Sequence, residues 1–248
     1  MVIAIANQKG GTAKSTTAAA LAQAAAYRGK KTLAIDLDPQ GNLTYFLKAD
    51  TSKGNALDLL QGKPLKEIAQ PAGRKLDAVA ASWNLQTISS GRGSARRLKT
   101  ALEPAAGEYD LIIIDTPPTA GVLQLNALMA ATDLIIPLAA DAVSLQGLYQ
   151  MANTAQQVKQ GNPALTLTGY ILTRYRANSK LAKQMTKLIK QAAEAQGIPF
   201  LVEIREAVAI QEAQALQRSL YEYAPLSNPA IDYSRLYRKI MEGKDNGR

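Results

Sequence analysis

Cysteine and histidine are both absent from this chain of 248 residues. Without cysteine, the protein has no disulfide, no thiolate metal site and no iron–sulfur cluster. Without histidine, it has no imidazole to act as a general acid or base near neutral pH. No apolar run approaches the roughly 20 residues that a membrane-spanning helix needs. Disulfide, iron–sulfur and imidazole chemistry are therefore excluded as a basis for function.

The chain does have enough length and apolar content for a large core, together with a positive charge. Its 248 residues are 47% hydrophobic, which fits one large α/β domain. We expect this domain at 1–242 and a short polar tail at 243–248. Met1 leads directly into an apolar run, so we expect no signal peptide, no N-terminal DNA-reading domain and a cytoplasmic location. The formal net charge of +9 suggests a polyanionic partner.

The most informative stretch lies near the start of the chain. A short apolar run, predicted as a strand, turns through Gly10 and Gly11 into Lys14 and Ser15, and an alanine-rich helix follows. Glycines let backbone N–H groups approach phosphate oxygens, and a helix N-terminus adds donors and a positive dipole end. Lys14 would neutralise the β- and γ-phosphates, and the Ser15 hydroxyl would complete a Mg²⁺ shell. The predicted nucleotide-binding residues of this loop are Gly10, Gly11, Thr12, Ala13, Lys14, Ser15 and Thr16.

This loop departs in two ways from the usual G-x-x-x-x-G-K-[ST] spacing. Lys9 precedes the glycine pair, and Ala13 stands where the last glycine normally sits. K-G-G-x-x-K-[ST] is the deviant Walker A motif, and the chain resembles the ParA/MinD family of ATPases from end to end. In that family the early lysine reaches across a nucleotide-sandwich dimer to the partner's phosphates, so the resemblance implies this role for Lys9. We expect the Ala13 side chain to fit only with a negative φ and enough room, with nucleotide bound and turnover slow.

Two acidic segments follow predicted strands. Asp36 and Asp38 begin a D-x-D-P-Q-G-N string, which resembles the family's switch I segment. The resemblance implies that Asp38 positions or polarises the attacking water and that Asp36 helps to order the magnesium site. Asp115 ends an aliphatic run typical of a strand buried on both faces, and this is the Walker B position. The Thr-Pro-Pro that follows Asp115 resembles switch II. Lys9, Lys14 and Asp38 are thus the predicted catalytic residues, and Ser15, Asp36 and Asp115 the predicted metal-site residues.

Apolar strands alternate with helices along the chain. This alternation predicts an α/β fold with a mostly parallel, twisted sheet covered by helices on both faces. The resemblance implies a P-loop NTPase, closest to Soj-like ParA proteins without an N-terminal DNA-reading domain. In such relatives the residues after the strand at 167–173 lie beside adenine, which implies a base contact for Thr173 and Arg174.

A second basic region extends from 174 to 190 and contains no acidic residue. Its lysines are spaced three, four and three residues apart, so they share one face of a predicted helix. We expect Leu181, Met185, Leu188, Ile189 and Ala192 to pack on the sheet from roughly the opposite face. The lysines would then form an unpaired cationic stripe that contacts a phosphate backbone, although an ordinary solvated face is the alternative. The predicted DNA-binding residues are Arg174, Arg176, Lys180, Lys183, Lys187, Lys190 and Arg205.

The family resemblance implies the function. It implies an ATP-dependent homodimer, with Mg²⁺, that binds double-stranded DNA non-specifically and drives plasmid or chromosome partition with a ParB-like protein. It also implies a cytoplasmic, nucleoid-associated protein that does not bind membranes. Ala209 stands about where relatives carry a second DNA-contacting arginine, which shifts the prediction toward the lysines. Two alternatives remain: a MinD-like ATPase recruited to membranes, and a nucleotide-gated DNA-binding scaffold with negligible hydrolysis.

Overall fold

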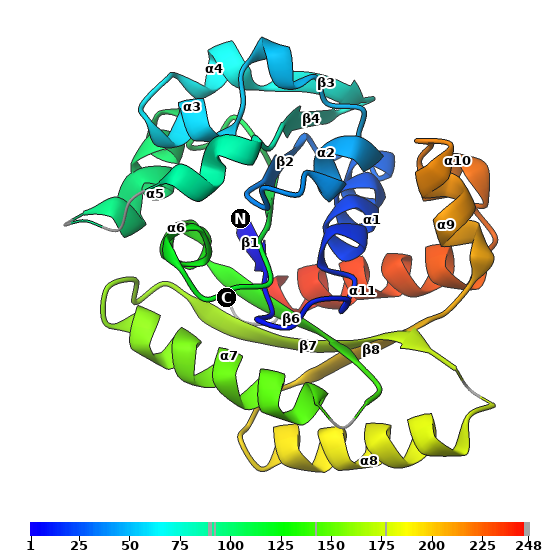
Figure 1. Ribbon diagram of the computed structural model, residues 1–248. Helices are drawn as coiled ribbons and strands as arrows, with labels where there is room; N and C mark the ends of the chain where they lie inside the picture. Colours follow the sequence, from blue (N-terminus) through cyan, green and yellow to red (C-terminus); the bar gives the residue numbers. More distant parts are fainter. Residues whose placement is uncertain (89–90, 92, 142, 177, 246–248) are drawn as a thin grey trace.

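The computed structural model describes residues 1–245 except 89, 90, 92, 142 and 177. Within this part, eight strands form one sheet (Figure 1). The strands are β1 (Val2–Ile5), β2 (Thr32–Asp36), β3 (Gln70–Gly73), β4 (Leu76–Val79), β5 (Leu111–Asp115), β6 (Asp133–Ala139), β7 (Thr166–Tyr175) and β8 (Phe200–Arg205). Their order is β3-β4-β2-β5-β1-β6-β7-β8, and each neighbouring pair is parallel except β3 and β4. This confirms the predicted mostly parallel sheet.

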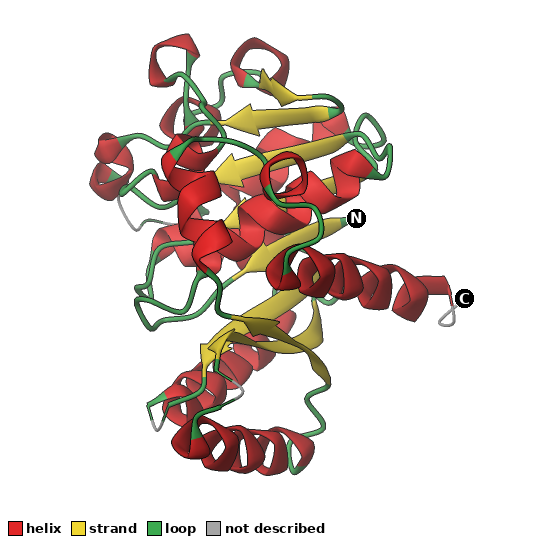
Figure 2. Cartoon of the chain, turned by 90° about the vertical axis from the view of Figure 1, so that its right-hand side faces the viewer, coloured by secondary structure: helices red, strands yellow, loops and turns green. Residues whose placement is uncertain are grey.

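Helices cover both faces of the sheet (Figure 2). They are α1 (Lys14–Tyr27), α2 (Asn42–Phe46), α3 (Ala56–Leu60), α4 (Leu65–Ile68), α5 (Arg97–Leu102), α6 (Val122–Ala130), α7 (Ser144–Lys159), α8 (Lys180–Glu194), α9 (Val208–Ala215), α10 (Leu220–Tyr223) and α11 (Asn228–Asp245). One hydrophobic cluster joins the sheet to α3–α8, and a second joins it to α1, α2 and α9–α11. The described chain is therefore a three-layer α/β structure.

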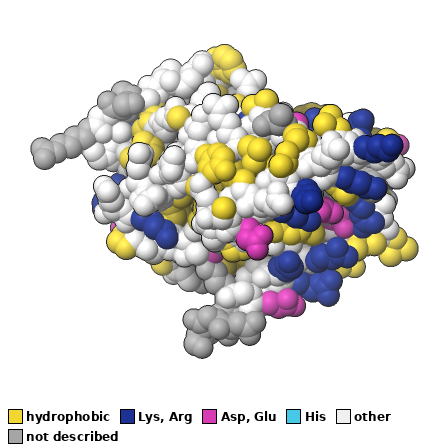
Figure 3. All heavy atoms as spheres, turned by 90° about the horizontal axis from the view of Figure 1, so that it is seen from below, with side chains coloured by type: hydrophobic (Ala, Val, Ile, Leu, Met, Phe, Trp, Pro, Cys, Tyr) yellow, Lys and Arg dark blue, Asp and Glu magenta, His cyan; other side chains and the backbone are white. Residues whose placement is uncertain are grey.

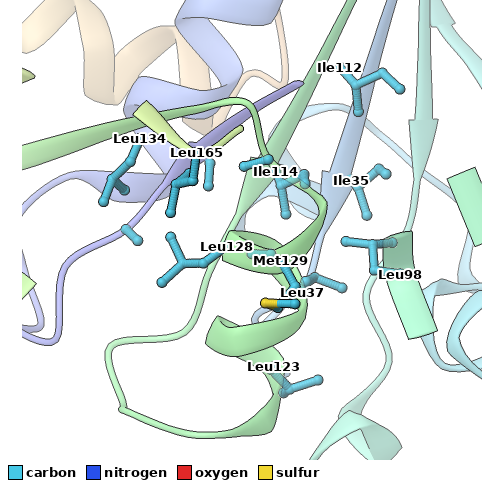
Figure 4. Close-up of a cluster of buried hydrophobic side chains, with 14 of the residues drawn as sticks. Ile35, Leu37, Leu98, Ile112, Ile114, Leu123, Leu128, Met129, Leu134 and Leu165 are labelled. Carbon is cyan, nitrogen blue, oxygen red and sulfur yellow. The ribbon is translucent and has the colours of Figure 1, made fainter. Parts of the chain in front are cut away.

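Strand β5 shows how the sequence produces these layers. Ile112 and Ile114 lie in the first cluster (Figure 4), whereas Leu111 and Ile113 lie in the second. Successive side chains of a strand point to opposite faces, so an unbroken aliphatic run fills both cores. The prediction of a strand buried on both faces is confirmed.

Helix α1 carries the phosphate-binding motif into the core. Ten of its residues are buried, and seven of these are alanines. The small side chains let the helix lie close to the sheet and to α11, where the hydroxyls of Thr17 and Tyr233 are 3.2 Å apart. The N-terminus of α1 is thus held rigidly at the edge where the parallel strands end.

Candidate functional site

The loop between β1 and α1 forms an open cradle at the carboxyl edge of the sheet. Gly11 has φ of 73°, which requires glycine or a strained residue. A Cβ at Gly10 or Gly11 would meet nothing within 4 Å, so the space beside the loop is open. No side chain caps the first turn of α1. Its free N–H groups and positive dipole end are suited to bind an anion.

Ala13 differs from the expectation. Its φ is 61° and its ψ 37°, in the left-handed region, where we expected a negative φ. An L-residue with a Cβ pays roughly 1–2 kcal/mol in this conformation. The loop geometry therefore dominates the local preference of alanine, and Ala13 is a strained residue at the start of α1.

Lys14 lies inside the cradle. Its side chain is buried, with 7% of the residue exposed, and Nζ donates a hydrogen bond to the Lys9 carbonyl at 3.1 Å. Burial lowers the pKa of Lys14, and the nearby Asp115 and Asp38 oppose this shift. A polyphosphate would add negative charge beside an ammonium that the fold has already desolvated.

Strands β2 and β5 bring two carboxylates together, since Asp36 and Asp115 are register partners. Asp36 accepts hydrogen bonds from the N–H and hydroxyl of Thr44, both at 2.8 Å, and from the Asp38 N–H at 3.0 Å. Burial still raises the pKa of Asp36 to about 6. Asp36 therefore joins β2, the D-x-D loop and α2.

Asp115 is fully buried and incompletely bonded. One oxygen accepts from the Thr116 N–H at 3.0 Å, while Oδ2 has no hydrogen-bond partner in the described structure. Burial and the neighbouring Asp36 raise the pKa of Asp115, and the Ser15 hydroxyl partly offsets the rise. Burial also raises the pKa of Asp38. A buried oxygen left without a partner indicates a site made for a cation or its bound water.

These residues fit a magnesium site that uses the nucleotide. Within the described ranges, no group of three or more acidic side chains could hold a metal ion. Mg²⁺ is commonly bound by one or two protein groups together with phosphate oxygens and water. Ser15 and Asp115 would supply the protein side of such a shell.

Lys9 lies beside the loop and is held within the same chain. Its Nζ is 2.7 and 2.6 Å from the two carboxylate oxygens of Asp141. Partial burial alone would raise the pKa of Asp141, but hydrogen bonds from Lys9 and Ser144 outweigh it and lower the pKa. Sequence reasoning missed Asp141, although its position just after β6, at the same sheet edge, was a usable signal.

A pocket of about 240 Å³ adjoins the loop. Its lining includes Ala13, Thr173, Arg174, Glu206 and Gln211. Thr173 is buried, and its hydroxyl lies within hydrogen-bonding distance of the carbonyls of Thr12 and Leu138, at 3.1 and 3.2 Å. Thr173 thus fixes the loop, and its contact with a base stays a prediction. A larger hollow of about 1020 Å³ lies between α3 and α5, away from these side chains.

The basic residues of the C-terminal region separate into free and paired groups. Lys180, Lys183 and Lys187 are exposed on α8, and the described residues offer them no ion-pair partner. Lys190 instead pairs with Glu203 at 2.8 Å and lies over the Phe200 ring. The expectation that all four lysines are unpaired is therefore wrong for Lys190. Figure 3 views the molecule from below the orientation of Figure 1 and shows Lys and Arg side chains gathered on one part of that surface.

The arginines of the predicted DNA surface are also paired. Arg174 and Arg176 both contact Glu206, and Arg205 pairs with Asp232 at 2.7 Å. Asp232 is 1% exposed, so its bond fastens β8 to α11. These contacts reduce the positive charge that the arginines present, and they make the lysines of α8 the stronger candidates for a phosphate contact.

The apolar side of α8 also differs from the expectation. Leu181 and Leu188 are 65% and 46% exposed, although we expected both to pack on the sheet. The buried residues of the helix are Ala182, Thr186, Ile189 and Ala193. The packed face is centred about one third of a turn away from the leucines, which leaves them on a flank of the helix.

The chain is similar to known proteins over most of its length. Residues 1–167 match the family model described as an AAA domain. The chain is 36% identical to the chromosome partitioning protein ParA of Myxococcus xanthus, over 97% of this chain and 88% of that protein. It is also 36% identical to the chromosome-partitioning ATPase Soj of Thermus thermophilus, over 96% of this chain and 94% of the relative.

A solved structure has a similar fold. Cobyrinic acid a,c-diamide synthase from Mycobacterium smegmatis, with bound ADP and magnesium, has a TM-score of 0.84 and 30% identity. The match covers 100% of this chain and 96% of that one. None of the described helices is both long and apolar enough to cross a membrane.

Proposed function

Since the chain belongs to the ParA/Soj family of ATPases, we propose that it is a partition ATPase that binds DNA as an ATP-dependent dimer. It hydrolyses ATP to ADP and phosphate, and Mg²⁺ held by Ser15 and Asp115 would neutralise phosphate charge in this reaction. Its cellular task is the partition of a plasmid or a chromosome, as the names of its relatives suggest.

One observation carries this proposal: the buried Lys14, the unpartnered Asp115 Oδ2 and the open N-terminus of α1 lie at one sheet edge. Together they supply a cation, a metal-side acceptor and backbone donors for one triphosphate. Residues 10–16 cradle the phosphates, and Asp38 orients the attacking water. Asp36 supports the metal site through its bonds to switch I and α2. Thr173 and Arg174 border the base.

Nucleotide controls the assembly of two chains. Lys9 of each protomer contacts the triphosphate of its partner, so the dimer forms only around ATP. Phosphoryl transfer depends on positioned charge more than on covalent chemistry. Hydrolysis cleaves the γ-phosphate from the triphosphate that Lys9 of the partner contacts, and the protomers can then separate.

DNA binding follows from the dimer. The free lysines Lys180, Lys183 and Lys187 form the main contact with the phosphate backbone. Lys190 and the paired arginines Arg174, Arg176 and Arg205 contribute less, because acidic neighbours already neutralise them. Two linked surfaces bind more tightly than one, since the second contact is nearly intramolecular.

The remaining parts of the proposal concern partners and place. A ParB-like, centromere-binding protein stimulates hydrolysis, and the dimer associates with the nucleoid in the cytoplasm. The ATPase domain covers residues 1–242, and 243–248 are a tail. The proposal that the ATP-bound protein binds DNA and not a membrane rests on the free lysines of α8.

A filter-binding series with double-stranded DNA tests the switch. The protein is titrated with ATP, with ADP and without nucleotide, each with Mg²⁺. We expect high affinity only with ATP and a steep loss of affinity as salt increases. Equal affinity in all three states would rule out the nucleotide switch, and binding to anionic vesicles with no binding to DNA would favour a membrane-recruited ATPase.

A further inference from the structure

A second pocket lies away from the phosphate loop. Its volume is about 770 Å³, which is in the range of small-molecule sites. Its walls are the end of α1, the end of α2, the turn between β3 and β4, and the segment from α9 to α10 (Figure 1). It shares no lining residue with the pocket beside Ala13. The phosphate loop precedes α1, a helix about 20 Å long, and this pocket lies at the other end of that helix.

Hydrogen bonds join these walls to one another. The Gln217 side chain donates to the Tyr45 carbonyl at 2.8 Å, which ties the segment between α9 and α10 to α2. The Leu220 N–H donates to the Gln23 side chain at 3.2 Å, which ties α10 to α1. The pocket is therefore preformed, and a ligand would not have to order its walls.

One wall carries an exposed aromatic ring. Tyr27 is 71% exposed, and its ring stacks on that of buried Tyr221, with the centroids 5.8 Å apart and the planes at 20°. Tyr221 thus holds one face of the Tyr27 ring and leaves the other face open. Phe46 adds a second ring to the lining. A ring held in this way is a platform on which a flat aromatic ligand can stack.

The pocket also carries unpaired positive charge. Its lining includes the basic residues Lys48, Arg74 and Arg218 and one acidic residue, Glu222. All three basic side chains belong to exposed residues, and none has an ion-pair partner in the part of the chain that the structure describes. Arg218 lies over the Tyr223 ring, 5.8 Å from its centroid. Guanidinium groups match the oxygens of phosphate, so the charge favours a phosphate-bearing ligand.

Strained backbone is also found at this pocket. Five non-glycine residues among those described have a positive φ. Ala13 and Arg174 line the pocket beside the phosphate loop. Lys48, at 55°, and Gln217, at 49°, line the second pocket, and Lys75, at 57°, lies in the turn between β3 and β4. Residues held in this region gather at ligand sites, and here they mark the nucleotide site and the second pocket.

We propose that the second pocket binds a nucleoside monophosphate, with its base stacked on Tyr27 and its phosphate bound by Arg74 and Arg218. This site goes beyond the proposed function, since neither hydrolysis nor DNA binding requires it. An aromatic ring beside free cations is the combination that recognises a base and a phosphate together. A single nucleotide fits a hollow bounded by four segments of the chain better than a continuous strand does.

Calorimetric titration of the full chain with AMP and with GMP tests the proposal. Mg²⁺ and an unreactive ATP analogue first fill the phosphate loop, at the lowest concentration that saturates it. We expect one of the two monophosphates to bind with one molecule per chain. Tyr27→Ala should weaken this binding by roughly 5- to 150-fold, the loss expected for one stacked base. Tyr149→Ala, at an exposed tyrosine of α7, is the matched control and should leave the affinity unchanged.

The phosphate half of the site is tested separately. Arg74→Gln and Arg218→Gln should each weaken binding by about two- to fivefold, as for exposed ion pairs, whereas Lys63→Gln, at an exposed lysine elsewhere, should not. Inorganic phosphate and the nucleoside alone should each bind more weakly than the monophosphate. Phosphate that binds as tightly as the monophosphate would overturn the assignment of a nucleotide. Binding of a single-stranded oligonucleotide in place of both monophosphates would overturn it as well.

Photolabelling locates the ligand without any variant. The 8-azido derivative of the monophosphate that binds is cross-linked to the wild type under the same conditions, and the adducts are mapped by mass spectrometry. We expect adducts in the segments that contain Tyr27 and residues 217–222. Adducts confined to residues 9–16, or no binding of either monophosphate, would overturn the proposal and would leave the proposed ATPase function intact.

Discussion

The chain has two groups of lysines that are built in opposite ways. At the carboxyl edge of the sheet, Lys14 is buried and Lys9 is held by Asp141. On α8, Lys180, Lys183 and Lys187 are exposed, and nothing in the described structure pairs with them. The first group is fixed in position by burial or by an ion pair, and the second has solvent around every ammonium.

This difference predicts how each group would recognise phosphate. A buried cation acts at one point, and its removal leaves the opposing charge unpaired. Exposed cations act together through counterion release, so each contributes a modest, salt-dependent share. We therefore expect single substitutions to be severe at the strand ends and graded on α8.

The largest effect is expected for Lys14→Met. Removing one partner of a desolvated, hydrogen-bonded charge pair costs about 2–5 kcal/mol, or roughly 30- to 5000-fold in affinity. Titration with a fluorescent ATP analogue measures this loss, with circular dichroism to verify folding. Lys180→Met is the matched control from the other group and should leave nucleotide affinity unchanged. Similar losses of nucleotide affinity in both variants would contradict the distinction between the two groups of lysines.

The lysines of α8 should show the graded behaviour. Replacing Lys180, Lys183 and Lys187 with Gln should reduce the slope of log affinity against log salt by about 0.9 for each lost phosphate contact. DNA binding by the ATP-bound protein is measured at salt concentrations from about 50 to about 300 mM. Lys190→Gln should change the slope less than Lys187→Gln, because Glu203 already pairs with Lys190. An equal change would mean that this ion pair does not matter for DNA.

Buried charge at the strand ends should also make stability depend on pH. Burial raises the pKa of Asp36 from 3.8 to about 6, so the folded state binds the proton more tightly than the unfolded state. Stability without nucleotide should therefore increase by about 1–3 kcal/mol as pH falls from above 6 toward 4. Thermal melts of the wild type and Asp36→Asn isolate this contribution. A pH dependence of the same size in both proteins would exclude Asp36 as its source.

The smallest effect concerns the strained loop residue. Ala13→Gly relieves the left-handed conformation but increases the entropy of the unfolded chain, for a net stabilisation of about 0.5–1 kcal/mol. Ala106→Gly is the control. Ala106 is exposed with φ of −60°, so glycine relieves no strain there and should lower the stability of the protein. Chemical denaturation measures both. ATP affinity should stay unchanged or rise in Ala13→Gly, and a large loss would contradict the proposed strain.

Local patterns predicted most of the fold and the phosphate loop. The aliphatic run before Asp115 and the glycine turn before Lys14 each carry their information within a few residues. Strand β3 was not predicted, since Gln70–Gly73 contains proline and glycine, which disfavour strands. It forms because β4 offers an antiparallel edge beside it.

The sequence could not predict which cations are paired. Lys190 meets Glu203 and Arg205 meets Asp232 only because the fold brings distant segments together. Helical spacing placed the leucines of α8 on one side, but it could not tell that Leu181 and Leu188 would lie beyond the covered face. The φ of Ala13 follows from the loop and not from the residue type.

The central claim is that a triphosphate joins two copies of this chain through Lys9. Sedimentation velocity of the wild type and Lys9→Ala, with Mg²⁺ and either ADP or an unreactive ATP analogue, tests it most directly. We predict a dimer only for the wild type with the ATP analogue. A single chain under every condition, or a dimer that persists equally in Lys9→Ala, would contradict the account.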